Sequence, residues 1–393
     1  MIEVIAIDGA TVSMAGDYYE TLIYCDAPER VYEYLIKNNF SFDSMEWREG
    51  DHSFVEIKAQ QFVYHALGIK LLELPEVHHI KKIAPVLPIM ARKKLSVPFI
   101  TCAEMMEYNA DKNLSLWELA IAYESQRGNI TKEAVFEKMR SILHIMENAI
   151  QLGLQGTQYE DRILGSQSLQ FKEQLQQKRL PGGDANNLVI MYVSAMMEVK
   201  SSMGVIVAAP TAGSCGALPG AIIGMGESMG LSETEKIKGL LAAGLIGLFI
   251  AAHATFAAEV GGCMAETGSG GGMAAAGIVQ MANGSIHQSI AAASLALQNS
   301  LGLICDPIGN RVEAPCLGRN VMAATNAVAC ANMALANYQH LIPLDEVIET
   351  MKNVGDEIHH TLRCTNLGGL SITKAAKEIE AQLEEATTFY KVC

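Results

Sequence analysis

Three cysteines in this chain, Cys263, Cys305 and Cys316, each lie beside glycine or proline and a carboxylate residue, in predicted loops. They are separated by 41 and 10 residues, which fits no short metal-binding motif. Three thiolates would suit a [4Fe–4S] cluster that leaves one iron open. Such an iron is a Lewis acid that binds a substrate oxygen and makes hydroxide a better leaving group. The alternative is that most of the nine cysteines are small core residues.

The segment Pro210–Gly216 combines small residues with the hydroxyl groups of Thr211 and Ser214. Small residues let backbone amides approach a ligand, and a helix starting near Gly216 would direct free N–H groups at an anion such as a carboxylate. The segment lacks the Gly-Lys-Ser/Thr ending of a nucleotide P-loop, and the glycine-rich loop predicted at 261–272 lacks the spacing of a dinucleotide site. A plain turn between buried helices is the alternative.

Composition excludes several classes of protein. The 393 residues are 50% hydrophobic and 18% charged, which excludes intrinsic disorder. The net charge of −14 argues against nucleic acid as a partner, because phosphate binding needs a basic face. No residue between Thr267 and Cys305 carries a formal charge, which indicates either a membrane segment or a dry helical core.

The uncharged run Gly239–Ala258 is long enough to span a bilayer. It contains His253 and several glycines, and it lacks positively charged loops at its ends, so we predict a buried helix and no membrane partner. The N-terminal stretch Met1–Ser13 has no basic region of the kind that begins a signal peptide. We therefore expect a cytoplasmic protein.

The spacing of hydrophobic residues predicts an α+β chain in two main parts. Over residues 1–90 the order of elements is β-α-β-β-α-β, the ferredoxin-like motif. Residues 100–375 are predicted to form a large all-α domain without strands, followed by a tail at 376–393. The helices expected in that domain include 131–152, 184–203, 218–229, 232–258, 272–282, 285–301, 320–340 and 344–362.

Five segments of the second domain resemble one enzyme family. They are Leu180-Pro-Gly-Gly-Asp-Ala185, Met203 to Ser214 with Pro210-Thr-Ala-Gly-Ser214, Gly261-Gly-Cys-Met-Ala-Glu266 with Met273-Ala-Ala-Ala276, Cys305-Asp-Pro307 with Glu313-Ala-Pro-Cys316 and Arg319-Asn320, and Gly368-Gly-Leu370. In order and spacing they are similar to the alpha (catalytic) chain of the iron–sulfur L-serine dehydratases, or L-serine ammonia-lyases. Residues 1–90, which contain Ile5-Ala-Ile-Asp-Gly9, are similar to the ACT-like domain at the end of that family's beta chain.

The resemblance implies that Cys263, Cys305 and Cys316 ligate a [4Fe–4S] cluster and that pyridoxal phosphate is not required. L-Serine would bind the open iron, a base would remove its α-proton, and the aminoacrylate formed would hydrolyse to pyruvate and ammonia. The residues implied to bind the substrate are Thr211, Gly213, Ser214 and Arg319, and Thr211 and Ser214 are also expected at the reacting centre.

Departures from the family pattern leave alternatives open. The Ser-Ser-Ser-His-Thr segment of the family's beta portion is missing, so a separate beta subunit would supply it, or the chain is degenerate and inactive alone. His253, ten residues before Cys263, stands where the family has an amide. It is our first candidate for the acid–base group, the alternative being a core histidine. Cys364 stands where the family often has a glutamate. Together, the altered positions His253 and Cys364 suggest an alternative activity, that of a cysteine desulfidase or a threonine dehydratase.

Two further expectations concern the ends of the chain. The terminal Cys393 is either incidental or a flexible thiolate that takes the vacant iron position and is displaced by serine. The segment Cys25-Asp-Ala-Pro-Glu29 lacks the glycine expected of an amino-acid-binding ACT domain, which favours a packing or dimerisation role. We expect a homo-oligomer.

Overall fold

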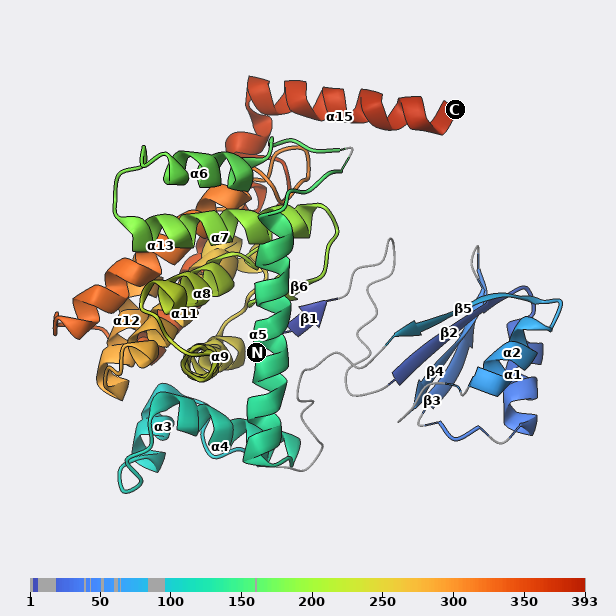
Figure 1. Ribbon diagram of the computed structural model, residues 1–393, viewed down its shortest axis with the longest axis horizontal. Helices are drawn as coiled ribbons and strands as arrows, with labels where there is room; N and C mark the ends of the chain where they lie inside the picture. The colour runs from blue at the N-terminus through green and yellow to red at the C-terminus, as the bar shows by residue number, and fades with distance from the viewer. Residues whose placement is uncertain are drawn as a thin grey trace. The chain divides into compact units, whose positions relative to one another are not determined.

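The computed structural model describes residues 3–5, 19–38, 40–42, 44–50, 53–59, 63, 65–83, 96–159 and 161–392. These residues belong to two compact units. One contains the described residues between 19 and 83, and the other contains β1 (Glu3–Ile5) together with the described residues from 96 onward (Figure 1).

The smaller unit is a four-stranded antiparallel sheet with two helices on one face (Figure 1). Its elements are β2 (Tyr19–Cys25), α1 (Pro28–Lys37), β3 (Ser44–Arg48), β4 (Phe54–Ala59), α2 (His65–Leu72) and β5 (Val77–Ile83), and the strand order is β3-β4-β2-β5. Side chains alternate between buried and half-buried along β4, so one face of the sheet packs against the helices. The predicted β-α-β-β-α-β order is confirmed.

The larger unit is helical, which confirms the α+β class. Its helices are α3 (Cys102–Tyr108), α4 (Leu116–Gly128), α5 (Lys132–Gly153), α6 (Gln167–Gln176), α7 (Asp184–Ser201), α8 (Ala217–Ser228), α9 (Glu233–His253), α10 (Ala258–Cys263), η1 (Met264–Gly268), α11 (Ser269–Met281), α12 (Ile286–Gln298), α13 (Cys316–Leu335), α14 (Leu344–Glu357), η2 (His360–Leu362), η3 (Gly369–Ile372) and α15 (Lys374–Val392).

The centre of this unit is α11, which packs against α8, α9, α12 and α13 (Figure 1). The prediction of a loop at 261–272 is wrong, because these residues form the end of α10, η1 and the start of α11. Its glycines permit close helix packing instead: a Cβ on Gly271 would lie 3.1 Å from the Ala323 carbonyl oxygen, and one on Gly272 would lie 2.9 Å from Leu297. Glycine richness therefore marks contact between helices at this place.

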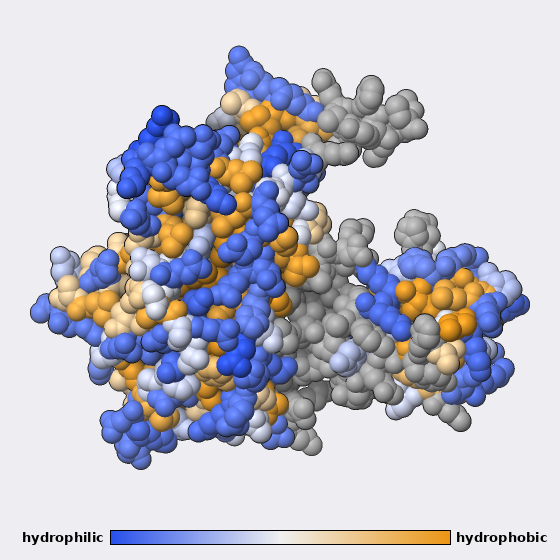
Figure 2. Space-filling model, in the orientation of Figure 1, coloured by the Kyte–Doolittle hydropathy of each residue, from blue (hydrophilic) through white to orange (hydrophobic). Residues whose placement is uncertain are grey.

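The apolar run predicted to be a buried helix is α9. It begins with a capping box, in which Ser232 accepts from the Glu235 N–H and the Glu235 carboxylate accepts from the Ser232 N–H at 2.7 Å. By length and composition it is the one helix among the described residues that could cross a membrane, but 67% of its most apolar window is buried in the unit. The face shown in Figure 2 mixes hydrophilic and hydrophobic residues without a continuous apolar belt.

One predicted helix boundary and the expected absence of strands in this domain were wrong. The helix predicted to run to Ala258 ends at His253, because Ala254 leaves helical geometry at φ −136° and ψ −145°. A strand, β6 (Ile206–Ala208), occurs where none was expected, and it pairs antiparallel with β1. Three residues are too few to show an alternating pattern, so the sequence carried no signal for this strand.

Candidate active site

Cys263 is placed by an unusual backbone at the end of α10. Gly262, directly before it, has φ +69° and ψ −175°, in the left-handed half of conformational space that glycine favours. A Cβ at Gly262 would lie 2.7 Å from the Leu303 carbonyl oxygen, and that oxygen accepts from the Met264 N–H at 3.0 Å. This close approach brings Cys263 beside the segment that carries Cys305.

The structure packs Cys263 and Cys305 into one buried cluster, although 41 residues separate them in the sequence. Both are buried, with exposures of 1% and 4%. Cys316, the first residue of α13, is 6% exposed and interacts electrostatically with Cys263. The three cysteines singled out in the sequence therefore lie together in the interior of the helical unit.

A fourth thiol that sequence reasoning did not assign to the site also lies here. Cys364 packs against the cluster of Ala258, Cys263 and Cys305, and its N–H donates to the Cys305 carbonyl oxygen at 2.8 Å. The only signal in the sequence was the replacement of the glutamate that the resembling family often has at this place.

The hydrogen bonds among these sulfurs shift their pKa values in opposite directions. Contact with Cys305 lowers the pKa of Cys263, and the neighbouring Arg319 acts in the same direction. Hydrogen bonds to Cys263 and Cys364 raise the pKa of Cys305, and burial raises the pKa of Cys316 to about 12. Adjacent thiols cannot all ionise without a cation between them. A metal bound here would displace their protons.

The guanidinium of Arg319 contacts this group directly. Its Nη1 donates to Cys263 Sγ at 3.5 Å and to the Ile304 carbonyl oxygen at 2.8 Å, and its Nη2 donates to Asp306 Oδ1 at 2.5 Å. Asp306 Oδ2 in turn accepts from the Leu370 N–H at 2.7 Å. The predicted substrate-binding Arg319 therefore already has protein partners, and it ties the Gly368-Gly-Leu370 segment to the thiols.

The hydroxyl-lined segment at 210–216 lies against Glu266, three residues after Cys263. Thr211 Oγ1 donates to Glu266 Oε1 at 2.5 Å, and the Thr211 and Ser214 hydroxyls are 3.2 Å apart. A Cβ on Gly213 would lie 2.3 Å from the same carboxylate oxygen, so this position needs glycine. Burial raises the pKa of Glu266, and the Thr211 hydrogen bond partly opposes that shift.

Asn320 joins this segment to Cys316. Its Nδ2 donates to the carbonyl oxygens of Gly213 and Cys316, each at 2.9 Å. Its Oδ1 accepts from the N–H groups of Gly216 and Ala217, at 3.2 and 3.1 Å. A helix does begin near Gly216 as expected, but Asn320 takes two of the N–H groups that the sequence suggested for an anion. In the described part of the chain, the N–H groups of Ala212 and Gly213 have no partner.

His253 and Lys200 differ in their placement. His253 is exposed at the end of α9, and its Nε2 lies 2.9 Å from the Ile100 carbonyl oxygen. Among the described residues, this contact is the one hydrogen bond of the His253 ring, and none joins it to the thiols or to Thr211. Lys200 donates to the Val312 carbonyl oxygen, just before Glu313 and Cys316. Burial lowers its pKa, and the neighbouring Cys215, Cys316, Glu313 and Glu266 oppose that shift.

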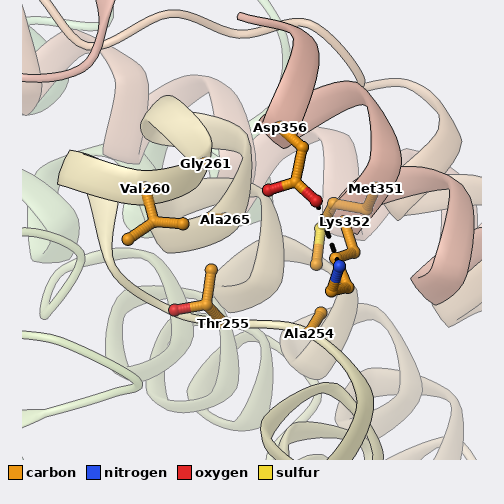
Figure 3. Close-up of a pocket in the computed structure, with 9 residues that line it drawn as sticks. Ala254, Thr255, Val260, Gly261, Ala265, Met351, Lys352 and Asp356 are labelled. Carbon is orange, nitrogen blue, oxygen red and sulfur yellow. Dashed lines mark hydrogen bonds and ion pairs between the residues drawn. The ribbon is translucent and has the colours of Figure 1, made fainter. Parts of the chain in front are cut away.

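A pocket of about 90 Å³ borders the Cys263 segment. Gly261 and Ala265 form one wall, and α14 forms another, where Lys352 donates to Asp356 at 3.0 Å (Figure 3). None of the thiols lines this pocket. It is separate from the thiol group.

The donor set fits an iron–sulfur cluster better than a single metal ion. Within the described residues, no three His, Cys, Asp or Glu side chains are arranged to hold one ion. The site instead offers neighbouring thiols, the ligands that iron–sulfur clusters use, with the charge of Arg319 beside them. The terminal Cys393 lies outside the described residues.

Buried thiols lie beside a turn that carries hydroxyl groups, within a helical unit. This arrangement is typical of a helical enzyme whose active site is formed by cysteines. The sequence model of the serine dehydratase alpha chain matches residues 111–371, which contain every thiol of this group. The chain therefore belongs to the serine dehydratase alpha-chain family, as the sequence motifs predicted, and it is a carbon–oxygen lyase.

Individual relatives agree with this membership. The chain is 37% identical over 285 residues to a probable L-serine dehydratase alpha chain of Bacillus subtilis, covering 72% of this chain and 95% of the relative. It is 34% identical over 280 residues to the L-serine dehydratase alpha chain of Peptoniphilus asaccharolyticus, covering 71% and 96%. With the L-serine dehydratase of Streptomyces coelicolor the identity is 30% over 282 residues, covering 71% of this chain and 62% of the relative.

Proposed function

We propose that this chain catalyses the β-elimination of water from L-serine, giving pyruvate and ammonia, with a [4Fe–4S] cluster held by Cys263, Cys305 and Cys316. The observation that carries this proposal is the packing of Cys263 against Cys305. The turn at 210–216 lies beside them, because Thr211 donates a hydrogen bond to Glu266. The names of the matched relatives supply the substrate.

The turn at 210–216 is suited to hold the substrate carboxylate. The free N–H groups of Ala212 and Gly213 are donors for an anion. The hydroxyls of Thr211 and Ser214, which bond to Glu266 and to each other, would turn to the anion when it binds. Burial raises the pKa of Glu266, which lessens the repulsion that this side chain exerts on the substrate carboxylate. When bound, the cluster would supply the Lewis acid that helps the β-hydroxyl group leave.

Arg319 acts as a positioning residue in this proposal. It fixes the Cys263 thiol and adds positive charge beside the thiolates, while Asp306 holds the guanidinium in place. For the acceptor of the α-proton, the sequence favours His253. Lys200 is our second candidate, because its ammonium group interacts electrostatically with Glu266 and Cys316, whereas His253 contacts the Ile100 carbonyl oxygen.

We further propose that a separate beta subunit completes the site. The relatives of Bacillus and Peptoniphilus are named alpha chains and are matched over nearly their whole length, whereas 62% of the Streptomyces enzyme is matched. We assign the unit at 19–83 to an ACT-like domain with a packing or dimerisation role, 100–375 to catalysis and 376–393 to a tail. Of the predicted range 1–90, β1 (Glu3–Ile5) belongs to the larger unit, where it pairs with β6. We expect a cytoplasmic homo-oligomer.

Anaerobic reconstitution of the full chain with iron and sulfide tests this function. We expect the broad visible absorbance of a [4Fe–4S] cluster, a change in that absorbance on adding L-serine, and release of pyruvate. Parallel assays with L-cysteine for sulfide and L-threonine for 2-oxobutyrate separate the alternative lyase reactions. A colourless protein without turnover, even with a beta subunit from the same source, would contradict the proposal.

A further inference from the structure

The pocket that lies between α10 and α14 has an apolar interior. Its volume is about 90 Å³, and its apolar side chains belong to Ala254, Val260, Ala265 and Met351 (Figure 3). Thr255 also lines it, but its Oγ1 accepts from the Ala257 N–H at 3.1 Å, and its methyl group lies 3.7 Å from where a Cβ on Gly261 would be. Thr255 therefore adds a methyl group to the apolar lining.

One wall of the pocket carries both charges of an ion pair. Lys352 donates to Asp356 Oδ2 at 3.0 Å, and both residues face Val260 across the cavity (Figure 3). The two side chains are 51% and 54% exposed, so their attraction is weakened by water and each can turn to a ligand. A positive and a negative group beside an apolar cavity match the charged head and the aliphatic side chain of an α-amino acid.

The volume limits the size of that side chain. A cavity of about 150 Å³ holds benzene, which has six carbons, so one of about 90 Å³ holds about three or four carbons. An isopropyl group has this size. Val260 is 44% exposed although it is apolar, and a bound aliphatic group would cover it. The cavity therefore fits a small branched side chain better than an aromatic ring.

A ligand in this pocket would touch two helices that already meet closely. A Cβ on Gly355, in α14, would lie 3.0 Å from the Cα of Gly261, in α10. Cys263 is the last residue of α10. A molecule that contacts both helices stabilises their packing, and with it the segment that places Cys263.

We propose that this pocket binds a free α-amino acid with a small aliphatic side chain. Its carboxylate contacts Lys352, its ammonium group contacts Asp356, and its side chain lies between Val260 and Met351. The site is separate from the turn at 210–216, and the inference goes beyond the proposed function because binding here needs neither a cluster nor turnover. The bound amino acid is an effector of the α10 segment.

The first test measures binding of L-valine to the cluster-free full chain by equilibrium dialysis and by thermal unfolding. We expect one L-valine per chain, and a melting temperature that rises with L-valine concentration because the ligand binds the folded chain. L-Phenylalanine, whose ring exceeds the cavity, and isobutyrate, which lacks the ammonium group, should each bind at least about tenfold more weakly. Absence of saturable L-valine binding, or equal binding of L-phenylalanine, would overturn the inference.

Variants of the pocket test its charges and its cavity separately. Lys352→Met and Asp356→Asn each remove one charge and should weaken L-valine binding about tenfold or more. Val260→Phe fills the cavity from an exposed position and should abolish binding. The matched control is Lys374→Met, which breaks another exposed ion pair of the same spacing, with Glu378 in α15, and should bind L-valine as the wild type does.

Thr211→Val tests the competing location, because the turn at 210–216 is proposed to hold a carboxylate. Loss of L-valine binding in Thr211→Val, with full binding in Val260→Phe, would assign the amino acid to the turn and overturn the inference. Unchanged binding in all three pocket variants would overturn it as well. Each measurement uses the cluster-free chain, so failure to assemble a cluster or to release pyruvate would refute the proposed function alone.

Discussion

The guanidinium of Arg319 donates to Asp306 at 2.5 Å, and both side chains are largely withdrawn from solvent, with exposures of 14% and 2%. A pair of this kind is fixed by its surroundings, because each charge needs the other once water is excluded. The other nitrogen of the same guanidinium faces Cys263 at 3.5 Å. Asp306 therefore orients the cation that stands beside the first thiol of the site.

Replacing Arg319 by glutamine should destabilise the chain strongly. The change leaves the Asp306 carboxylate buried with only the Leu370 N–H as a donor, and breaking a buried pair costs about 3–5 kcal/mol. Urea unfolding of the cluster-free chain measures this loss. We also expect a lower iron content after reconstitution, because Cys263 loses its neighbouring charge.

The matched control for Arg319 is the exposed pair of Lys352 and Asp356, with exposures of 51% and 54%. Lys352→Ala should change the free energy of unfolding by about 0–1 kcal/mol. Equal losses in the two variants would mean that burial does not strengthen the Arg319–Asp306 pair, and the predicted difference between the buried and the exposed pair would be wrong.

Gly262→Ala should move Cys263 out of place. The alanine would have to adopt φ +69°, and its Cβ would lie 2.7 Å from the Leu303 carbonyl oxygen. Backbone strain of this kind costs about 1–3 kcal/mol, and the clash adds to it. Thermal unfolding should show the loss, and iron content after reconstitution should fall with it.

Gly244→Ala provides the control for glycine replacement. Gly244 lies within α9, and a Cβ there would meet no atom within 4 Å. Alanine favours helix over glycine by about 0.8–1.0 kcal/mol, so this variant should be as stable as the wild type or more so. The Gly262 prediction is refuted if its variant loads iron as fully as the Gly244 variant.

Much of the fold could be predicted from periodicity, and the failures have physical causes. The smaller unit alternates hydrophobic and polar residues, so its order of elements was readable from the sequence. The segment containing Cys263 was read as a loop because glycine is a weak helix former. Close contacts at Gly271 and Gly272 outweigh that preference, and contacts with distant residues cannot be read from a local pattern.

The site was predicted in part. Cys263, Cys305, Cys316 and the turn at 210–216 were found from their residue types and lie together. Asn320 and Lys200 were missed as connecting groups, because their partners are 104 and 112 residues away in the sequence. Residue type alone did not distinguish Cys364 from a small core residue.

Glu266 should make the stability of the cluster-free chain depend on pH. Burial raises its pKa above the ordinary value of 4.5, so the folded chain binds a proton that the unfolded chain releases. The contribution of Glu266 to the free energy of unfolding is therefore fully present below pH 4.5 and is lost as the pH rises through the raised pKa. Its size is about 1.4 kcal/mol for each unit by which the pKa in the folded chain exceeds that in the unfolded chain. Melting temperatures of the wild type and of Glu266→Gln, measured over a range of pH, test this prediction. The variant should not show the loss of stability with rising pH that Glu266 causes in the wild type.

Glu235→Gln is the control with the opposite sign. Hydrogen bonds from Ser232 lower the pKa of the exposed Glu235, so its contribution to stability is present above the ordinary pKa and is lost in acid. The Glu235 variant should thus differ from the wild type at neutral pH and converge with it in acid. A Glu266 variant that follows the same course would contradict the raised pKa.

The last prediction separates the two candidates for the α-proton acceptor. Removal of a general base costs about 10²–10⁴ in kcat. Because His253 is exposed and its ring is engaged by the Ile100 carbonyl oxygen, His253→Ala should cost less than about tenfold in kcat. Lys200→Met should cost at least about 100-fold, because Lys200 lies near Glu266 and Cys316. Pyruvate release at matched iron content measures both.

Lys236→Met controls for the loss of a largely buried lysine, since Lys236 is 12% exposed and pairs with Glu147 away from the thiols. It should lower stability while leaving kcat per cluster unchanged. A loss of about 100-fold or more in His253→Ala, with Lys200→Met near the wild type, would restore His253 as the base. That result would require His253 to leave the Ile100 carbonyl oxygen and approach the thiols when substrate binds.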